Sequence, residues 1–343
     1  SINNQMAGNI TLKELAAILN VSVSTISKAL NDSHEISEST KKRIKELAKL
    51  HNYQPNRIAL GLKSGKTNTI GVILPSIQNP FFARVLFGIE KVIAQSSYNI
   101  IICITNESLE KEVTNMNMLS NGVVDGFIVA VAKETLSKQE LSHFNSVLLK
   151  NKPIVMFDRV MDSVKCNRVI NNDYEAVYDA TTKMLNAGRK HIALVTTIQN
   201  ITVGENRIKG YKDALNNRFG QDCEKHIITS ESKAVREDMV QFIKNNPQID
   251  GIIALDQFSS YAALKATRYN NKSVPKDVAV IGYIAEGIAD NLNPELTTIN
   301  QHGTKTGTTI ANLIIKKLEA KPEERIQTEE VLISSTLTHR LTF

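Results

Sequence analysis

The sequence predicts an all-α helix-turn-helix head followed by an α/β domain with two lobes, each built on an open parallel sheet. Three observations predict this architecture. The first 66 residues are basic and contain three short helical patterns, whereas short apolar strands alternate with helical stretches from residue 69 onward. Parts of that second segment also repeat one another in their strand spacing. A chain of 343 residues is long enough to form both units.

The first predicted helix begins with a capping box. Thr11 can accept a hydrogen bond from a backbone amide in the first turn, and Glu14 can reach back to the backbone of Thr11. Apolar residues then recur at helical spacing, at Leu12, Leu15, Ala16 and Leu19. We therefore expect a short amphipathic helix that ends near Asn20.

A second helix is predicted from Val23 to Leu30, with Ser22 as its N-cap. The residues expected to face the core are Val23, Ile26 and Leu30. The outer face carries polar side chains, at Ser24, Thr25, Ser27 and Lys28. Such a face suits a helix in the major groove of DNA, because bulky residues would hold the backbone away from the base edges.

A third helix is predicted from Glu38 to Leu50, with Ser37 as its N-cap. Residues of this helix are expected to complete a small three-helix core, at Ile44, Leu47 and Ala48. The opposite face is basic, with Lys41, Lys42, Lys45 and Lys49. A solvated basic surface on a three-helix core is the simpler alternative to a contact with DNA.

Positive charge is concentrated at the N-terminal end of the chain. Residues 1–66 contain ten Lys or Arg residues against five acidic residues, which accounts for +5 of the net charge of +6. The head therefore has an electrostatic reason to bind a polyanion. In the segment that follows, Pro55 can begin a helical turn and Gly65 can end it, but so short a helix is not stable in isolation.

The second part of the chain alternates strands and helices. The candidate strands are Ile70–Leu74, Ile100–Ile104, Gly126–Val129, Ile154–Phe157, Ile192–Val195, Gly251–Ala254 and Val278–Ile281. Segments 69–72 and 124–128 are echoed by segments 191–194 and 249–253 at nearly the same separation. This echo predicts two similar lobes that hold a ligand between the carboxyl ends of their strands.

Several polar side chains are expected just beyond the ends of these strands. They are Asn106, Asp158, Arg159, Arg207 and Asp256. A carboxylate or a guanidinium can make two hydrogen bonds to vicinal hydroxyls or to a carboxylate of a small ligand. A structural ion pair between the lobes is an equally open interpretation of Asp158 and Arg159.

Two further pairs have alternative interpretations. The neighbouring rings of Phe81 and Phe82 can stack on a sugar or a base, or they can belong to the hydrophobic core. Asn172 and Asp173 precede a predicted helix, and one of them is expected to cap it rather than to contact a ligand.

The sequence lacks the motifs of the common enzyme and metal classes. It contains no GxGxxG, Walker, GxSxG or HExxH motif, and its three cysteines have no metal or redox spacing. We therefore expect no catalytic residue, no metal and no cofactor. No apolar run is long enough to span a membrane and the N-terminus lacks the layout of a secretory signal, so a cytoplasmic location is expected. An exported solute-binding receptor with the same two lobes is the main alternative, but it would have no use for a basic head.

Short motifs occur in a fixed order along nearly the whole chain. They include Val21 to Asn31, Tyr53-x-Pro55-Asn56, Ala59-x-x-Leu62, Asn79-Pro80-Phe81-Phe82, Asp158-Arg159, Gly188 to Ala193, Arg207-x-x-Gly210-Tyr211 and Leu296 to Ile299. In this order and spacing they resemble the lactose-repressor/galactose-repressor family of transcription regulators. The chain departs from the commoner family pattern in two places. It has Leu60-Gly61 where the family commonly has a basic or small polar pair, and Tyr283-Ile284-Ala285 where the family commonly places an acidic or amide residue.

For the head, the resemblance implies contact with double-stranded, pseudo-palindromic operator DNA. Val23, Ser24 and Lys28 would read bases in the major groove. The residues that would contact phosphates or support that pose are Thr11, Ser22, Thr25, Ser27 and Asn31. Tyr53, at the end of the head, would also contact DNA. The hinge would fold on DNA and contribute Asn56, Ala59, Leu62 and Lys63. Leu62 would insert into a central minor-groove step and kink the duplex.

For the second unit, the resemblance implies a periplasmic-binding-protein-like sensor that controls the operator affinity of a repressor. The residues expected to bind the effector are Phe81, Phe82, Asn106, Asp158, Arg159, Arg207 and Asp256. A sugar or sugar phosphate is the first candidate effector, and a nucleoside or purine is the second. Two copies would form a homodimer along helices such as residues 82–94 and their counterpart in the second lobe. The protein would be associated with the bacterial nucleoid.

The resemblance also implies where the parts begin and end. The expected helix-turn-helix domain comprises residues 8–53, the hinge and linker residues 54–67, and the sensor residues 68–343. Within the sensor the chain would cross between the lobes three times. The expected lobes are residues 68–161 with 292–322, and residues 162–291 with 323–343.

Overall fold

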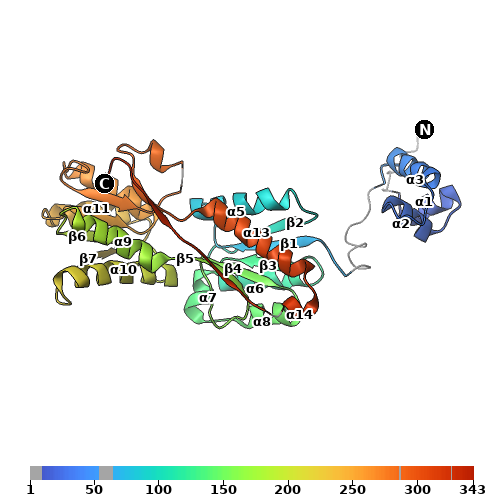
Figure 1. Ribbon diagram of the computed structural model, residues 1–343, viewed down its shortest axis with the longest axis horizontal. Helices are drawn as coiled ribbons and strands as arrows, with labels where there is room; N and C mark the ends of the chain where they lie inside the picture. The colour runs from blue at the N-terminus through green and yellow to red at the C-terminus, as the bar shows by residue number, and fades with distance from the viewer. Residues whose placement is uncertain (1–9, 54–64, 286, 326) are drawn as a thin grey trace, which may run out of the picture. The chain divides into compact units, whose positions relative to one another are not determined.

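The computed structural model describes residues 10–53, 65–285, 287–325 and 327–343 (Figure 1). Contacts between residues divide the chain into two compact units, Ser1–Thr67 and Asn68–Phe343, which we call the head and the sensor. The hinge residues expected to bind DNA, at Asn56, Ala59, Leu62 and Lys63, lie outside the described residues.

The head contains the three predicted helices with the predicted bounds: α1 (Leu12–Leu19), α2 (Val23–Leu30) and α3 (Glu38–Leu50). The capping box is present, because Glu14 N–H donates to Thr11 Oγ1 over 3.3 Å and Thr11 N–H donates to Glu14 Oε2 over 2.7 Å. Asn20 ends α1 in the left-handed conformation. The core of the head contains Ala16, Ile26, Ala29 and Ile44.

Two side chains of the head face differently from the prediction. Val23 is 39% exposed rather than buried, because it lies in the first turn of α2, before the residues of that helix that reach the core. Lys41 is buried rather than exposed. It precedes Ile44 by three residues and Ala48 by seven, so it shares their face of α3, and its ammonium group bonds Glu38 at the helix surface over 2.7 Å.

The first lobe of the sensor is built on a six-stranded parallel sheet in the order β11-β5-β4-β3-β1-β2. Its strands are β1 (Thr69–Leu74), β2 (Asn99–Ile104), β3 (Gly126–Val129), β4 (Ile154–Phe157), β5 (Asn167–Asn171) and β11 (Glu330–Ile333). One core cluster lies under α5 (Pro80–Ile93) and α13 (Gly303–Glu319). A second cluster lies on the other side of the sheet, under α6 (Leu109–Ser120), α7 (Lys133–Lys138) and α8 (Ser142–Leu149).

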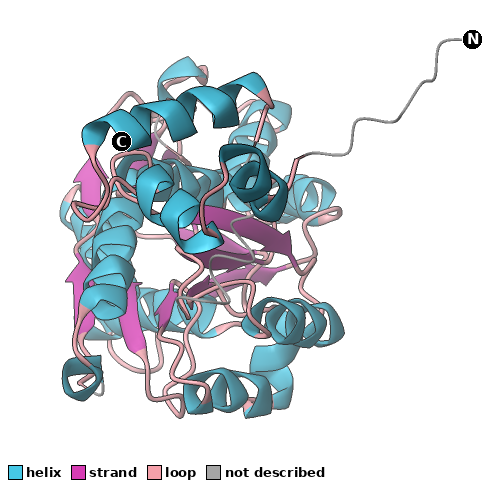
Figure 2. Ribbon diagram, turned by 90° about the vertical axis from the view of Figure 1, so that its right-hand side faces the viewer, coloured by secondary structure: helices cyan, strands magenta, loops and turns pink. Residues whose placement is uncertain are grey.

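The second lobe is built on a sheet in the order β12-β10-β9-β8-β6-β7, which is parallel except for β12. Its strands are β6 (Ile192–Thr196), β7 (His226–Thr229), β8 (Gly251–Ala254), β9 (Ala279–Gly282), β10 (Thr297–Asn300) and β12 (Thr336–Thr338). The helices that cover it are α9 (Asp173–Asn186), α10 (Thr202–Phe219), α11 (Val235–Asn245) and α12 (Gln257–Tyr269). Two short helices complete the sensor, η1 (Ala289–Asn291) and α14 (Pro322–Arg325). Figure 2 shows helices on both sides of the strands.

The predicted lobe boundaries are wrong in three places. Strand β5 pairs with β4 and so belongs to the first lobe, β10 pairs with β9 in the second lobe, and β11 pairs with β5 in the first. The chain therefore crosses between the lobes after β5, after β10 and after β11. Strands β5 and β10 each pair with the strand that precedes them in sequence, whereas β11 pairs with β5, about 160 residues earlier. The backbone pairing decides each case, and the apolar pattern of a single segment does not record which sheet the segment joins.

The seven predicted strands are present within one residue of their expected ends. The prediction missed β5, β7 and β10, which carry polar residues and lack a continuous apolar run. The C-terminal segment from Leu332 to Phe343, which the sequence predicts as strand and tail, contains the end of β11 and the whole of β12. Within the described chain, no helix is long and apolar enough to cross a membrane.

Candidate functional sites

The exposed face of α2 carries polar side chains at helical spacing. Ser24 and Asn31 are exposed, and Lys28 between them is partly exposed. These residues are separated by four and three positions, so they lie on one side of the helix, opposite the buried Ile26 and Ala29. Exposed Val23 adjoins this face. The structure thus brings together the three side chains expected to read bases, Val23, Ser24 and Lys28.

Most of the predicted phosphate contacts lie at the ends of the helices of the head. Thr11 and Ser22 are the N-caps of α1 and α2, and Ser22 Oγ accepts a hydrogen bond from Thr25 N–H over 3.0 Å. Asn31 is the C-cap of α2, and Ser27 and Tyr53 are partly exposed. A helix N-terminus carries partial positive charge, so the caps at Thr11 and Ser22 suit contact with an anion.

Two exposed ammonium groups of the head pair with nearby carboxylates. Lys28 pairs with Glu35, and Lys45 pairs with Asp32. Lys42, Lys45 and Lys49 lie on one exposed face of α3, as the sequence predicted. Because the paired side chains are exposed, each ion pair contributes little stability and can exchange its carboxylate for a phosphate.

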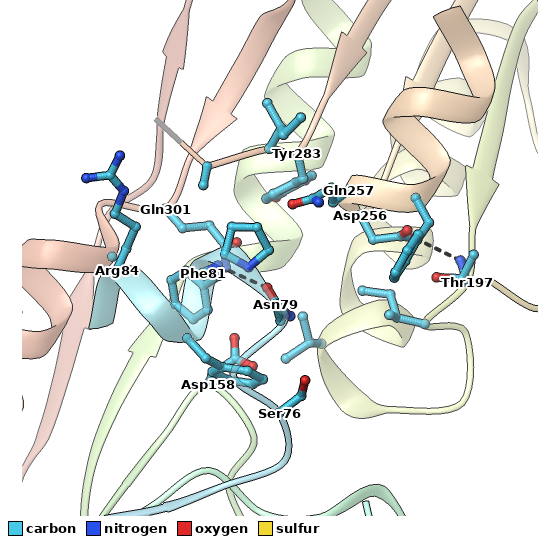
Figure 3. Close-up of a pocket in the computed structure, with 18 of the residues that line it drawn as sticks. Ser76, Asn79, Phe81, Arg84, Asp158, Thr197, Asp256, Gln257, Tyr283 and Gln301 are labelled. Atoms are coloured by element: carbon cyan, nitrogen blue, oxygen red, sulfur yellow. Dashed lines mark hydrogen bonds between the residues drawn. The ribbon is translucent and has the colours of Figure 1, made fainter. Parts of the chain in front are cut away.

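A cleft of about 380 Å³ lies in the sensor and is lined by residues of both lobes (Figure 3). The first lobe contributes the loop after β1 and the start of α5, with Ser76, Asn79 and Phe81. The second lobe contributes residues that follow β6, β8 and β9, including Thr197, Asp256 and Tyr283. The cleft is therefore at the carboxyl ends of the strands, where open α/β sheets bind ligands.

Six of the seven predicted effector residues line this cleft. They are Phe81, Phe82, Asp158, Arg159, Arg207 and Asp256. Asn106 does not line it and is exposed, whereas the next residue, Glu107, does line it. Both residues have positive φ values, 50° and 65°, so the chain turns sharply after β2 and the strand alternation cannot be extended to them. Glu107 is the residue that the sequence-based prediction missed at this position.

Phe81 and Phe82 differ in burial, which the sequence did not predict. Phe82 is 1% exposed and packs edge to face against Phe157, with ring centroids 6.0 Å apart. Phe81 is partly exposed. Phe82 therefore belongs mainly to the core beneath the cleft, and Phe81 offers the ring that a ligand can touch.

Arg207 is buried and fully engaged with its own lobe. Its Nε donates to Asp173 Oδ1 and its Nη1 to Leu255 O, each over 2.7 Å. The guanidinium lies 3.7 Å from the centroid of the Tyr283 ring. Burial raises the pKa of Asp173, and the attraction of Arg207 opposes that rise. The expected helix cap at Asn172 or Asp173 is wrong, because no side chain caps α9 and Asp173 instead anchors Arg207.

Asp256 lines the cleft and links two segments of the second lobe. Its Oδ1 accepts a hydrogen bond from Ser259 N–H over 3.0 Å, so Asp256 is the N-cap of α12. Its Oδ2 accepts from Thr197 N–H over 2.8 Å, which ties the start of α12 to the loop after β6 (Figure 3). A carboxylate offers about four acceptor positions, so this one retains limited capacity for a ligand.

Asp158 and Arg159 sit together on the first lobe, so the pair is not a bridge between the lobes. Both Oε atoms of Glu107 accept a hydrogen bond from Arg159 Nη1 over 2.6 Å, whereas Asp158 Oδ2 is 3.9 Å from Arg159 Nε. Glu107 also accepts a hydrogen bond from Lys133 N–H over 2.8 Å. Burial raises the pKa of Asp158 to about 6, even though Arg159 and Arg207 act to lower it.

Three buried polar atoms of the cleft residues have no hydrogen-bond partner among the residues that the structure describes. They are Arg159 Nε, Gln257 Oε1 and the Tyr283 hydroxyl. Leaving such an atom unpaired costs about 1–3 kcal/mol. Together they offer a donor, an acceptor and a hydroxyl to a ligand in the cleft. Gln257 and Tyr283 were not predicted, because neither glutamine nor tyrosine is distinctive in sequence.

Part of the wall of the cleft is apolar. Its side chains are Ile198, Ile201, Val203, Phe258 and Ile284. The arrangement can therefore hold a small molecule that has a polar edge and an apolar face. Within the described part of the chain, no group of His, Cys, Asp or Glu residues is arranged to hold a metal ion.

Comparison with known protein families identifies both units. Residues 11–56 match the family of bacterial regulatory proteins, lacI family. Residues 67–341 match the periplasmic binding proteins and sugar binding domain of LacI family. Together these matches cover both the head and the sensor.

Characterised relatives match over almost the whole chain. The transcriptional repressor PurR of Aliivibrio fischeri is 30% identical over 342 residues, which is 96% of this chain and 99% of that protein. The transcriptional regulator RegA of Clostridium saccharobutylicum is 31% identical over 91% of this chain and 93% of its own length. The ribose operon repressor of Halalkalibacterium halodurans is 27% identical over 91% of each chain.

Solved structures share the fold. The Lac repressor dimer bound to operator and the anti-inducer ONPF superposes with a TM-score of 0.83 at 19% identity, over 98% of this chain and 99% of that one. The regulator from Enterococcus faecium with bound ribose superposes with a TM-score of 0.69 at 24% identity, over 80% of this chain and 98% of that one. The family resemblance and the fold class predicted from the sequence are both confirmed. The chain belongs to the LacI family of bacterial regulatory proteins.

Proposed function

We propose that this protein is a transcriptional repressor whose affinity for a pseudo-palindromic operator is controlled by a small molecule in the cleft of the sensor. The observation that carries the effector part is the set of unpaired buried polar atoms at Arg159, Gln257 and Tyr283. The exposed polar face of α2 supports the part that concerns DNA. Such a protein would act on chromosomal DNA, in the nucleoid region of the cytoplasm.

In this proposal the head enters the major groove with α2. Val23, Ser24 and Lys28 contact base edges, and the caps at Thr11 and Ser22 contact phosphates. The hinge residues Asn56, Ala59, Leu62 and Lys63 bind at the centre of the operator. The residues of the hinge are assigned from the family resemblance alone.

Replacing Lys28 with alanine is expected to weaken binding to the preferred operator about 10-fold or more, because a base contact contributes about 1–3 kcal/mol. Binding to random DNA is expected to fall much less. Competitive titration of both duplexes at one salt concentration measures the two effects. Lys13→Ala is the matched control, because Lys13 is exposed on α1 and is not among the proposed DNA contacts. An equal loss on both duplexes would remove Lys28 from the residues that read sequence.

We propose that the protein acts as a homodimer, since one small head reads too few base pairs for specificity in a genome. Apolar side chains are exposed on the first lobe at Phe87 of α5 and at Ile101 and Ile102 of the edge strand β2. Exposed apolar groups on an open sheet edge are typical of an interface. This face includes α5, the helix along which the sequence predicts dimer contact.

Replacing Phe87 with glutamate is expected to shift the protein from dimer to monomer, because the substitution places a charge in the centre of the proposed interface. Sedimentation equilibrium should show dimer association weakened at least 10-fold, a loss of about 1.4 kcal/mol. Phe219→Glu serves as the control, because Phe219 is 49% exposed at the end of α10 and outside the proposed interface. A Phe87→Glu protein that remains fully dimeric would exclude this face.

A sugar or sugar derivative is the first candidate effector in this proposal. The relative from Enterococcus faecium contains bound ribose, and a regulator CelR was solved with cellobiose. A nucleoside or purine is the second candidate, since Phe81 and Phe258 offer rings on which a planar base can stack. Thermal melting of the full chain in the presence of sugars, sugar phosphates, nucleosides and purines distinguishes the classes. A ligand at a concentration of 100 times its Kd stabilises the folded protein by about 2.7 kcal/mol.

Coupling between cleft and DNA follows from the topology of the sensor. Effector contacts both lobes, so binding changes the angle between them at the three crossing segments. That movement would shift the hinges of the two subunits and so favour or disfavour the DNA-bound state.

Selection of random duplex DNA by the purified protein, followed by sequencing, tests the central proposal. An enriched inverted repeat with a flexible central step is the expected result. A folded dimer that enriches no sequence, alone or with each compound that raises its melting temperature, would contradict the proposed function.

A further inference from the structure

The side chain of Asp125 contacts Asn68, the residue at which the chain enters the sensor. The backbone N–H of Asn68 donates to Asp125 Oδ2 over 2.7 Å. The N–H of Asp125 donates to Thr69 O, and the N–H of Asn99 donates to Asn68 O, each over 2.8 Å. Asn68 has a φ of 49°, in the left-handed region that residues with a Cβ adopt only when their surroundings favour it. Two of these hydrogen bonds involve Asn68 itself and restrain its conformation, and the third holds Asp125 beside Thr69.

Two buried strands connect this point to the cleft. Strand β1 runs from Thr69 to Leu74, and Ser76 follows in the cleft wall. Strand β3 begins directly after Asp125 and leads through buried residues to Lys133, which also lines the cleft. The two strands pair over four residues, a length of roughly 13 Å, so this part of the sheet moves as one body. A tilt of the first lobe therefore moves Asn68 together with β1.

The Asp125 carboxylate is not needed to hold the neighbouring backbone of the sheet in place. Lys152, which lies near Asp125, donates to Val124 O over 2.5 Å and holds the adjacent backbone without help from Asp125. Within the sheet, β1 and β3 are already paired by four residues of register. The bond to Asn68 instead restrains the residue before β1, through which the linker from the head enters.

We propose that Asp125 is a positioning residue that fixes the direction in which the linker leaves the sensor. A fixed exit on each subunit makes the spacing between the operator half-sites part of what the dimer reads. This inference rests on the proposed function, because it requires a dimer that binds two half-sites.

The test compares full-length variants on the operator obtained by selection and on duplexes with one base pair inserted at its centre. The wild-type protein is expected to bind the longer duplex at least 10-fold more weakly. Asp125→Ala is expected to reduce this ratio to about 3-fold or less, because Asn68 is released. Asp125→Asn is the matched control, since its amide oxygen can still accept from Asn68 N–H, and it should retain the wild-type ratio.

Hydrogen exchange at the Asn68 amide supplies a second readout that a purely structural role for Asp125 in the sheet would not move. In Asp125→Ala this amide should exchange at least 10-fold faster, while the amides of β1 and β3 keep their wild-type rates. If Asp125→Ala does not give a folded dimer, Asp125→Ser replaces it, because its hydroxyl is too short to reach Asn68.

The inference is overturned if the folded alanine or serine variant keeps the full spacing penalty, or if its Asn68 amide stays as protected as in the wild type. Failure of the wild-type protein to enrich any operator is a different result. It would contradict the proposed function and leave the exchange measurement to decide whether the restraint on Asn68 exists.

Discussion

Replacing Arg207 with alanine is expected to lower the free energy of unfolding of the sensor by about 3–5 kcal/mol. Arg207 is 3% exposed and is the ion-pair partner of Asp173, which is also buried. Its removal leaves the Asp173 carboxylate and the Leu255 carbonyl without their donors, and it removes the cation from the face of the Tyr283 ring. Urea unfolding of the full-length protein, followed by circular dichroism, measures the change.

The pH dependence of the stability of Arg207→Ala identifies the cause of its loss of stability. Without Arg207, the pKa of Asp173 rises further above its ordinary value of 3.8. A carboxyl whose folded pKa is raised destabilises the protein in its ionised form, so the deficit should shrink as the pH falls through that pKa. Adding Asp173→Asn should restore part of the lost stability at pH 7.5, because it removes the unpaired charge.

Lys212→Ala is the control on the same helix, since Lys212 is exposed on α10, and it should change stability by less than about 0.5 kcal/mol. An Arg207→Ala protein as stable as the wild type would show that the buried pair does not support the lobe. Because Arg207 lines the cleft, the variant should also lose its melting response to any effector found by screening.

Replacing Asp158 with asparagine is expected to stabilise the sensor by up to about 3 kcal/mol at pH 7.5. The carboxyl group is buried and its pKa is raised from 3.8 to about 6, so its ionised form is disfavoured by the fold. The wild-type protein should therefore lose stability as the pH rises from about 4 to about 6, and the loss should be complete above that window. Asparagine lacks this dependence.

The difference between the two proteins should be near zero at pH 4 and largest above pH 7, as measured by melting temperature across a buffer series. Asp222→Asn is the control, because Asp222 is exposed and its replacement should leave the pH profile unchanged. A constant difference between wild type and Asp158→Asn from pH 4 to pH 8 would exclude a raised pKa as the cause. Weaker effector binding by the more stable variant would show that the carboxylate is kept for ligand contact.

Local chemistry predicted the elements of the fold well. The caps at Thr11, Ser22 and Ser37 and the spacing of apolar residues set the bounds of α1, α2 and α3. Continuous apolar runs located seven strands, and six of them are buried because a strand covered on both faces must be apolar at every position. The seventh, β2, is an edge strand that is apolar although partly exposed. Strand β5, with alternating burial, lacks such a run and was missed.

The candidate site was predicted less completely. Residues such as Asp158 and Arg159 could be named because they follow a recognisable strand. Glu107 was missed because the chain turns through two left-handed residues after β2. Gln257 and Tyr283 were missed because an unpaired polar atom is a property of its surroundings, not of its residue type.

The sequence by itself determined the family, the helices of the head and the central strands, since caps and periodicity act between residues that are close along the chain. The tertiary structure alone decided which sheet receives β5, β10 and β11, and therefore where the lobes begin. It also decided that Glu107 holds Arg159 from 52 positions away and that Asp173 holds Arg207 from 34. Partners so far apart in sequence are selected by backbone pairing and burial in space, and these act only after the strands have assembled.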